Sequence, residues 1–243
     1  TNILVTSADG ARHCSLHKGP VFGQVILADE IIRATPKTQS SLLEAMQEHA
    51  CTIAGVRHAM EEPFFVIATQ NPIEQEGTYP LPEAQLDRFL MKIVVNYPSR
   101  EELNRIVDRT VRKEEVHLEP VMGREEILEL RSVCREILVA PHVQDFAIDL
   151  VMATQPGTRH SHPLADKYIR YGSSPRGAQA LVECGRVHAL LAGRAHLAAD
   201  DIEAVAAAVL RHRIICNFDA HADGQTPDSL LEGIIRAVKA PTS

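Results

Sequence analysis

The chain has 243 residues, of which 45% are hydrophobic and 23% charged, which is enough to bury a sizeable core and excludes wholesale disorder or a fibrous repeat. The formal net charge of −7, with no run of Lys or Arg, argues against a surface built mainly to hold a nucleic acid backbone. The longest apolar runs, such as Phe64–Ala68, are too short to span a bilayer, and the start at Thr1 does not resemble a signal peptide, so we expect a cytoplasmic protein.

The cysteines and histidines do not predict a metal site. Five scattered cysteines, an odd number, suit a reducing compartment better than a disulfide framework. His160 with His162, or His13 with His17, would each offer two ligands, but no third ligand stands at a supporting spacing. We expect these histidines to lie in loops or on the surface.

The first part of the chain predicts short strands. Two β-prone runs, Ile3–Val5 and Cys14–Leu16, lie on either side of the turn dipeptide Asp9-Gly10 and predict a hairpin. The run Val25–Ala28 is apolar without alternation, which is typical of a parallel strand covered on both faces. The acidic pair Asp29-Glu30 follows directly at the carboxyl end of this strand.

A helix, a hairpin and a second strand come next. Thr35-Pro36 is a capping hydroxyl followed by a proline at the first helical position, and apolar residues recur at helical spacing to about residue 48. A small hairpin around 52–58 then precedes the run Phe64–Thr69, which predicts a second buried strand ending at Gln70-Asn71.

The alternation of strands and helices continues to residue 98 and then stops. Pro82–Arg88 predicts a short helix and Leu90–Val95 a third strand, so the first domain, 1–98, is expected to be α/β with a parallel sheet. The second domain, 99–243, is expected to be helical, with 157–172 as an irregular connector. Its expected helices span about 99–113, 123–138, 142–155, 175–193, 199–212 and 228–238.

Polar residues at the ends of the first two long strands are the candidate site, because ligands of open α/β sheets gather at the carboxyl ends of strands. Asp29 is suited to holding hydrated Mg²⁺, and Glu30 to polarising a water that attacks a terminal phosphate. Asn71 is suited to orienting that water or sensing the γ-phosphate. Simpler interpretations remain open: Asp29 as a cap of the next helix, and Asn71-Pro72 as an ordinary turn.

Two arginines extend the candidate site. Arg88 carries a guanidinium suited to bidentate phosphate contact and is a candidate arginine finger for a neighbouring subunit, although a salt bridge with Asp87 or Glu83 would explain it as well. Arg176 stands at a helix start in the second domain, where anions are favoured, and is a candidate reporter of nucleotide state. The alternative for Arg176 is simple solvation.

Long runs of the sequence resemble the MoxR family of AAA+ ATPases. The likeness is carried by Gly19–Glu48 and Phe64–Phe89, and it extends through Gly172–Arg176 and Val209–Arg213, so that it covers nearly the whole chain. The resemblance implies an AAA+ P-loop-type parallel sheet flanked by helices, followed by an all-α lid domain. It also implies hexameric rings with chaperone-like remodelling activity, often beside partners that carry a von Willebrand factor A domain.

The resemblance assigns a role to each candidate residue around ATP and Mg²⁺. The acidic pair would be a Walker B motif, and the hairpin around 52–58 would be the insertion that the family carries before sensor 1. The remaining assignments are sensor 1 at Asn71, a trans-acting arginine at Arg88 and sensor 2 at Arg176.

One family element has no counterpart in this sequence. A phosphate-binding loop requires the pattern Gly-x-x-x-x-Gly-Lys followed by Ser or Thr, and none of the 13 glycines is followed by Lys. The family places this loop upstream of residue 1, on the central strand, between the strands expected at Phe64–Thr69 and Leu90–Val95. We therefore expect a chain that starts partway into the domain and that binds ATP weakly when alone.

Three functions remain in competition. The first is an ATP-hydrolysing remodeller whose nucleotide cycle moves the lid through Arg176. The second is a non-catalytic assembly or interaction subunit, which the missing loop favours and the retained candidate residues oppose. The third, a motor acting on nucleic acid, is disfavoured by the acidic balance.

Overall fold

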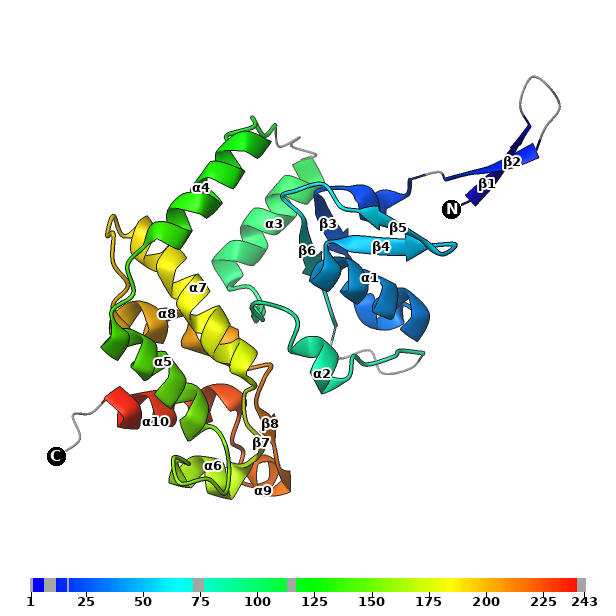
Figure 1. Cartoon of the computed structure of the whole chain (residues 1–243). Helices are drawn as coiled ribbons and strands as arrows, with labels where there is room; N and C mark the ends of the chain where they lie inside the picture. The colour runs from blue at the N-terminus through cyan, green and yellow to red at the C-terminus, as the bar shows by residue number, and fades with distance from the viewer. Residues whose placement is uncertain (1, 7–11, 17, 72–76, 113–116, 240–243) are drawn as a thin grey trace. The chain divides into compact units, whose positions relative to one another are not determined.

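The computed structural model describes residues 2–6, 12–16, 18–71, 77–112 and 117–239 (Figure 1). These residues form two compact units, Thr1–Arg88 and Phe89–Ser243. Each unit has its own secondary structure and its own buried residues.

The first unit begins with the predicted hairpin. Strands β1 (Asn2–Thr6) and β2 (Arg12–Leu16) pair antiparallel, with Asn2 opposite Leu16. The hairpin is confirmed, while the expected turn at Asp9-Gly10 lies outside the described residues.

A parallel strand pair carries the carboxyl-terminal edge at which the candidate site was expected. Strand β3 (Val25–Ala28) pairs with β6 (Phe65–Ala68), so that Ala28 stands opposite Ala68. The predicted parallel arrangement is confirmed. Because the strands run in the same direction and in register, Asp29 and Thr69 leave the sheet at the same edge.

The two strands of this pair were predicted to be buried on both faces, and here the prediction is wrong for one face. Exposure alternates along both strands, with Ile26 and Val66 half-buried. The side chains on the other face remain open to solvent: Val25 at 67%, Leu27 at 64%, Phe65 at 54% and Ile67 at 46% exposure.

Helix α1 (Pro36–Glu48) starts as predicted, because the Thr35 hydroxyl accepts a hydrogen bond from the Thr38 amide at 3.4 Å and Pro36 occupies the first turn. The predicted small hairpin follows as β4 (Ala50–Ile53) and β5 (Val56–Ala59). Buried Ala45, Cys51 and Met60 pack α1 against this hairpin. The remaining short elements of the unit are the 3₁₀ turns η1 (Pro20–Phe22) and η2 (Ile31–Arg33) and helix α2 (Glu83–Leu86).

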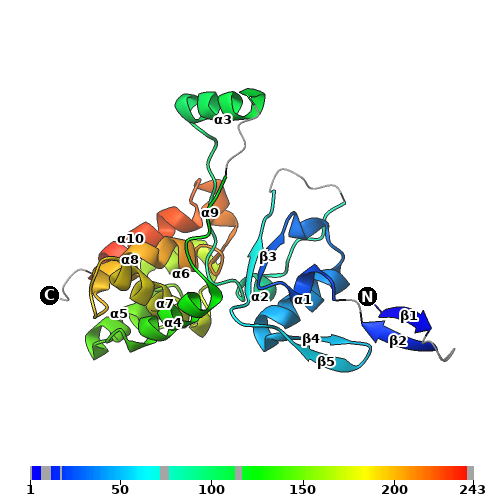
Figure 2. The same cartoon turned by 90° about the horizontal axis from the view of Figure 1, so that it is seen from above.

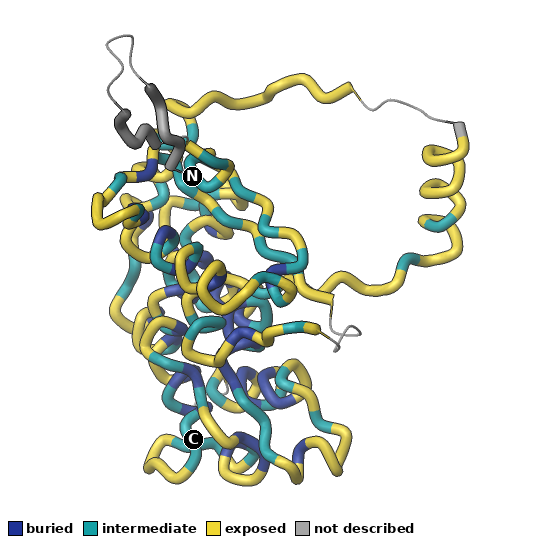
Figure 3. Tube along the Cα trace, turned by 90° about the vertical axis from the view of Figure 1, so that its right-hand side faces the viewer, coloured by how far each residue is buried: buried dark blue, intermediate teal, exposed yellow. Residues whose placement is uncertain are grey.

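The second unit is built from helices, four of which make its core. Helices α5, α7, α8 and α10 pack together (Figure 2) and carry most of the unit's buried residues. Leu150, Leu181, Ile202 and Ile234 are almost completely buried there. Figure 3 shows the buried residues of the molecule in dark blue. The helices are α3 (Arg100–Arg112), α4 (Arg124–Glu136), α5 (Pro141–Ala153), α6 (Pro163–Tyr168), α7 (Pro175–Leu191), α8 (Ala199–Leu210), α9 (Phe218–Ala222) and α10 (Pro227–Lys239).

Two features of this unit correct the sequence-based expectations. The connector expected at 157–172 contains helix α6, which begins at Pro163 with the His162 ring accepting a hydrogen bond from the Leu164 amide at 3.1 Å. It also contains strand β7 (Ile169–Tyr171), which pairs antiparallel with β8 (Ile215–Cys216). The lid is therefore mainly helical with one small strand pair, instead of all-α.

The segment Leu90–Val95 corrects a third expectation. It forms no strand, and the chain divides after Arg88 instead of after residue 98. A strand requires a neighbour to pair with, whereas the backbone groups of this segment are bonded to the end of helix α8, as with the Lys92 amide, which donates to the Ala208 carbonyl at 2.8 Å. Residues 89–98 therefore belong with the helical unit.

Candidate functional site

The carboxyl ends of β3 and β6 are joined by one hydroxyl group. The Thr69 hydroxyl lies 2.5 Å from the Asp29 carboxylate, and the Glu30 amide donates to the same hydroxyl oxygen at 2.8 Å. Because a carboxylate only accepts, the hydroxyl proton is directed at Asp29 and its lone pair at Glu30. This geometry fixes the orientation of the Asp29 carboxylate and of the Glu30 backbone together.

Backbone contacts extend the strand pairing past the last strand residues. The Thr69 amide donates to the Ala28 carbonyl at 3.1 Å, and the Ile31 amide donates to the Thr69 carbonyl at 3.0 Å. Between these contacts Glu30 adopts a left-handed conformation, with φ at 50° and ψ at 50°. Such a conformation costs about 1–3 kcal/mol in a residue other than glycine, and the surrounding hydrogen bonds hold it in place.

The Glu30 carboxylate is paired with Arg33 in the same turn, at 2.8 Å from the guanidinium Nε. Both side chains are partly open to solvent, at 43% and 55% exposure. Exposed pairs of this kind contribute at most about 1 kcal/mol, so the carboxylate can leave Arg33 at little cost when another partner arrives.

A buried amide of α1 supports the turn that follows Glu30. Gln39 is 3% exposed, and its side-chain Nε2 donates to the Ile31 carbonyl at 3.1 Å and to the Tyr79 carbonyl at 2.8 Å. The Tyr79 amide in turn donates to the Ile32 carbonyl at 2.6 Å. Gln39 therefore ties the residues after the acidic pair to a loop from much later in the chain.

The predicted site residues of the first unit differ in what surrounds them. Asp29 does not cap the following turn η2, because the residue at the cap position is Glu30. The Glu30 side chain makes no capping hydrogen bond. Asn71 is exposed two residues beyond Thr69, next to the undescribed stretch 72–76. Arg88 is exposed at the end of the unit, and its amide donates to the Gln85 carbonyl at 3.2 Å.

Arg176 belongs to the second unit, in the first turn of α7. Its amide donates to the hydroxyl of the cap residue Ser174 at 3.2 Å, and its side chain is exposed. The next residue, Gly177, has no room for a side chain, because an added Cβ would lie 2.1 Å from the Ser173 hydroxyl and 3.0 Å from Leu210. The start of α7 is thus packed tightly against the end of α8, which fixes the backbone that carries Arg176.

Sequence reasoning missed Thr69 and Gln39. Both carried a signal: a hydroxyl residue at the end of the second strand, and an amide on the otherwise apolar face of a helix. Neither signal identifies a partner until the strand register and the turn are known.

The metal-binding potential of the site rests on Asp29. Among the described residues, no group of three His, Cys, Asp or Glu side chains is placed to surround a metal ion. A magnesium ion, however, is commonly held by one or two carboxylates together with water and substrate phosphates, and a single carboxylate at an exposed sheet edge fits that pattern. The described residues also contain no helix with the length and apolar character of a membrane span.

Comparisons with known proteins agree with this architecture. Residues 2–91 match the model of the ATPase family associated with various cellular activities (AAA), and residues 162–234 match the AAA lid domain. The chain is 38% identical to the chaperone MoxR1 of Mycobacterium tuberculosis over 96% of its own length and 61% of that protein. It is 31% identical to the protein MoxR of Methylorubrum extorquens, over 92% of its own length and 70% of that protein.

A solved structure shows the same fold. A crystal structure of a protein from Cytophaga hutchinsonii, assigned as an ATPase, superposes with a TM-score of 0.86 at 36% identity. It covers 97% of this chain, which in turn spans 71% of that protein. The chain therefore accounts for about two thirds of the length of its relatives.

Proposed function

The chain belongs to the MoxR family of AAA+ ATPases, and from this premise we propose that the Asp29–Thr69 edge of its sheet is the hydrolytic side of an ATP site. Asp29 would hold Mg²⁺ and Glu30 would polarise the attacking water. Asn71 would sense the γ-phosphate from the neighbouring strand.

The observation that supports this proposal is the shared hydroxyl of Thr69. It orients the Asp29 carboxylate and the Glu30 backbone at one edge, at 2.5 and 2.8 Å, where a helix cap would need neither contact. The Glu30 side chain remains able to exchange its partly exposed partner Arg33 for a water molecule. A preorganised acid pair of this kind is what water activation beside a phosphate needs.

Magnesium fits the donor set of this edge, because Asp29 supplies a hard carboxylate oxygen and Mg²⁺ keeps most of its water ligands. When bound, the ion would neutralise charge on the phosphates. The chain's own residues act around it: Thr69 holds the Asp29 carboxylate in one orientation, and Glu30 accepts a proton from water.

The two arginines would extend the proposed site to a neighbouring protomer and to the lid. Arg88 is exposed at the end of the first unit and carries a planar guanidinium, so, as the family resemblance implies, we propose that it contacts a nucleotide held by the next protomer of a hexameric ring. Arg176, on the fixed start of α7, would report the nucleotide state to the lid. A partner with a von Willebrand factor A domain and a cytoplasmic location complete the proposal, as the family resemblance and the scattered cysteines suggest.

The same fold is compatible with a second candidate function. A non-catalytic assembly subunit would have the same fold without hydrolysis, and the following experiment separates the two.

The test is Glu30→Gln in the native protein that contains this chain. The amide keeps the size of the side chain but cannot accept the proton of water, so ATP binding should persist while turnover falls by about 100-fold or more. Binding is measured by titration with a fluorescent ATP analogue, and turnover by phosphate release.

Glu61→Gln is the matched control, because Glu61 is an exposed carboxylate on the same unit, away from the sheet edge. It should leave both binding and turnover unchanged. Undiminished hydrolysis by Glu30→Gln would overturn the catalytic assignment, and absence of any hydrolysis in the unaltered protein would favour the assembly subunit.

A further inference from the structure

Three consecutive residues after helix α8 reach back to the start of the second unit. Arg211, His212 and Arg213 hydrogen-bond to backbone carbonyls between Phe89 and Lys92, more than a hundred residues earlier in the chain. We call these three side chains the carbonyl clamp. All of its contacts described here lie within the second unit.

The strongest part of the clamp is the Arg213 guanidinium. One of its nitrogens, Nη2, donates to the Phe89 carbonyl at 2.7 Å, while Nη1 donates to the Leu90 carbonyl at 3.1 Å and also to the Val209 carbonyl. His212 Nε2 lies 2.9 Å from the same Phe89 carbonyl, and since a carbonyl only accepts, this nitrogen carries the proton. The Phe89 carbonyl is therefore held by two donors at once.

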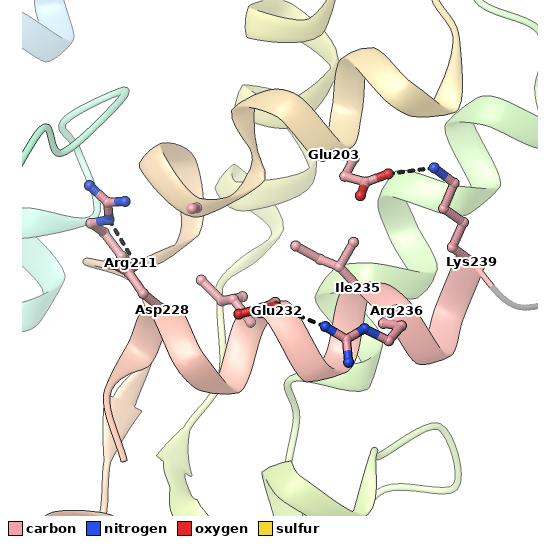
Figure 4. Close-up of a pocket in the computed structure, with 9 residues that line it drawn as sticks. Glu203, Arg211, Asp228, Glu232, Ile235, Arg236 and Lys239 are labelled. Carbon is pink, nitrogen blue, oxygen red and sulfur yellow. Dashed lines mark hydrogen bonds and ion pairs between the residues drawn. The ribbon is translucent and has the colours of Figure 1, made fainter. Parts of the chain in front are cut away.

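Arg211 completes the clamp and is itself fixed. Its Nη1 donates to the Lys92 carbonyl at 3.1 Å. Its Nε donates to the Asp228 carboxylate at 2.9 Å, and Figure 4 shows this pair among the residues that line the pocket along α8 and α10. Asp228 lies at the start of α10, so the clamp joins α8, α10 and the Phe89–Lys92 segment.

Two of the three clamp side chains are buried, so their contacts are shielded from solvent. Arg213 is 7% exposed and His212 is 8% exposed. The segment they hold has no regular secondary structure, so its carbonyls depend on side-chain donors. A planar guanidinium with fixed donor directions is the side chain best suited to hold two successive carbonyls in place.

The clamped segment begins one residue after Arg88. Consecutive Cα atoms lie about 3.8 Å apart, so holding the Phe89 carbonyl restricts where the Arg88 backbone can be. Arg88 is the last residue of the first unit, so the clamp fixes the chain at the point where the two units join.

We propose that the carbonyl clamp positions Arg88 for its action on the nucleotide of the next protomer, with Arg213 and His212 as the positioning residues. The inference rests on the proposed function and adds the way in which the lid controls the trans-acting arginine. Both clamp residues are buried and engaged with carbonyls, so they act through Arg88 and not on phosphate directly.

The first test is Arg213→Lys in the native protein. An ammonium keeps the charge but lacks the planar fork, so it cannot hold two carbonyls in fixed directions. Turnover should fall by about 10- to 100-fold, the size expected for a misplaced catalytic group, while nucleotide affinity stays unchanged. In the background of Arg88→Ala the same substitution should cause no further loss.

Mixed rings show whether the defect acts across the subunit interface. A Glu30→Gln protomer cannot hydrolyse ATP, but its Arg88 is intact. In a mixed ring it should therefore restore hydrolysis at the nucleotide sites of neighbouring Arg213→Lys protomers. It should do the same for neighbouring Arg88→Ala protomers. A defect confined to the protomer's own lid would not be restored. His212→Leu should behave like Arg213→Lys, and His212→Gln, whose amide reaches a similar position to the ring Nε2, should recover most of the rate.

Arg194→Lys is the matched control for general damage to the helical unit. Arg194 binds the buried Asp201 in the same unit and does not contact the clamped segment, so its loss should lower the melting temperature without a defect that Glu30→Gln protomers restore. Unchanged turnover in Arg213→Lys, or a loss that mixing does not restore while Arg88→Ala is restored, would overturn the clamp proposal alone. Failure of Arg88→Ala to be restored would overturn the trans-acting arginine of the proposed function.

Discussion

At the scale of single residues, the Thr69 hydroxyl is a small group that makes two contacts of the candidate site. Thr69→Val keeps the shape but removes both contacts, leaving the Glu30 amide without this acceptor and the Asp29 carboxylate without this donor. Together the two lost contacts are expected to cost about 1.4–2.7 kcal/mol in the transition state, so turnover should fall by about 10- to 100-fold. Phosphate release measured for the variant checks the prediction.

Thr69→Ser is the control for this variant, because it retains the hydroxyl and loses only a methyl group. It should keep a turnover within a few-fold of the unaltered protein. Equal rates for the Val and Ser variants would show that the shared hydroxyl does not orient the acidic pair.

The buried carboxylate of Asp201 makes a prediction about pH. Asp201 is completely buried and accepts hydrogen bonds from the Arg194 guanidinium, the His188 ring and the Ala198 amide. The Arg194 contact is the largest of the causes that hold the pKa of Asp201 far below its ordinary value. The charged form is thus stabilised by folding, and this stabilisation is present above the unfolded-state pKa of about 3.9 and is lost as the pH falls toward the folded-state pKa.

Asp201→Asn should therefore lower the free energy of unfolding by about 3 kcal/mol or more at pH 7, because Arg194 loses a charged partner. The difference between variant and unaltered protein should shrink as the pH is lowered below about 4. Urea denaturation at several pH values measures it. The exposed Asp149→Asn gives the baseline, and a difference that stays constant down to pH 2 would contradict the pKa argument.

The residues that the sequence predicted and those it missed differ in the information they need. Asp29 and Glu30 were predicted because they directly follow an apolar run, which is a local pattern. Thr69 was missed because its role depends on the register of β3 against β6. Gln39 was missed because its partners, at Ile31 and Tyr79, come from a turn and a loop that no periodicity describes.

At the scale of elements, long periodic segments were predictable and short ones were not. The expected helices at about 99–113 and 199–212 correspond to Arg100–Arg112 and Ala199–Leu210, because several helical turns give the pattern room to repeat. Helix α6 has only 6 residues, too few to show a period, although His162-Pro163 is a start signal for a helix.

The wrong strand at Leu90–Val95 shows a different limit. Its apolar, β-prone residues fit a strand locally, yet a strand exists only where a neighbour accepts its hydrogen bonds. In the structure Arg211, His212 and Arg213 bind the carbonyls of Phe89, Leu90 and Lys92 instead. No local pattern reports a competition between partners that lie more than a hundred residues apart.

At the scale of the whole molecule, the position of the boundary between the two units predicts how stable fragments of the chain are. If residues 89–98 belong to the helical unit, a fragment spanning 89–243 should fold cooperatively, with its core of α5, α7, α8 and α10 intact. A fragment spanning 99–243 has the same core but lacks the carbonyls of Phe89, Leu90 and Lys92 that the clamp holds.

The shorter fragment should have a free energy of unfolding lower by about 2 kcal/mol, since several hydrogen bonds of Arg211, His212 and Arg213 are replaced by contacts with water, each worth about 0.5–1.5 kcal/mol. Urea denaturation followed by circular dichroism compares the two. Arg213→Lys should destabilise the longer fragment more than the shorter one, because the shorter one has no Phe89 or Leu90 carbonyl to lose and retains only the Val209 carbonyl as a partner. Equal stability of the two fragments would show that residues 89–98 do not belong to the helical unit. It would also show that the lid does not hold the backbone next to Arg88.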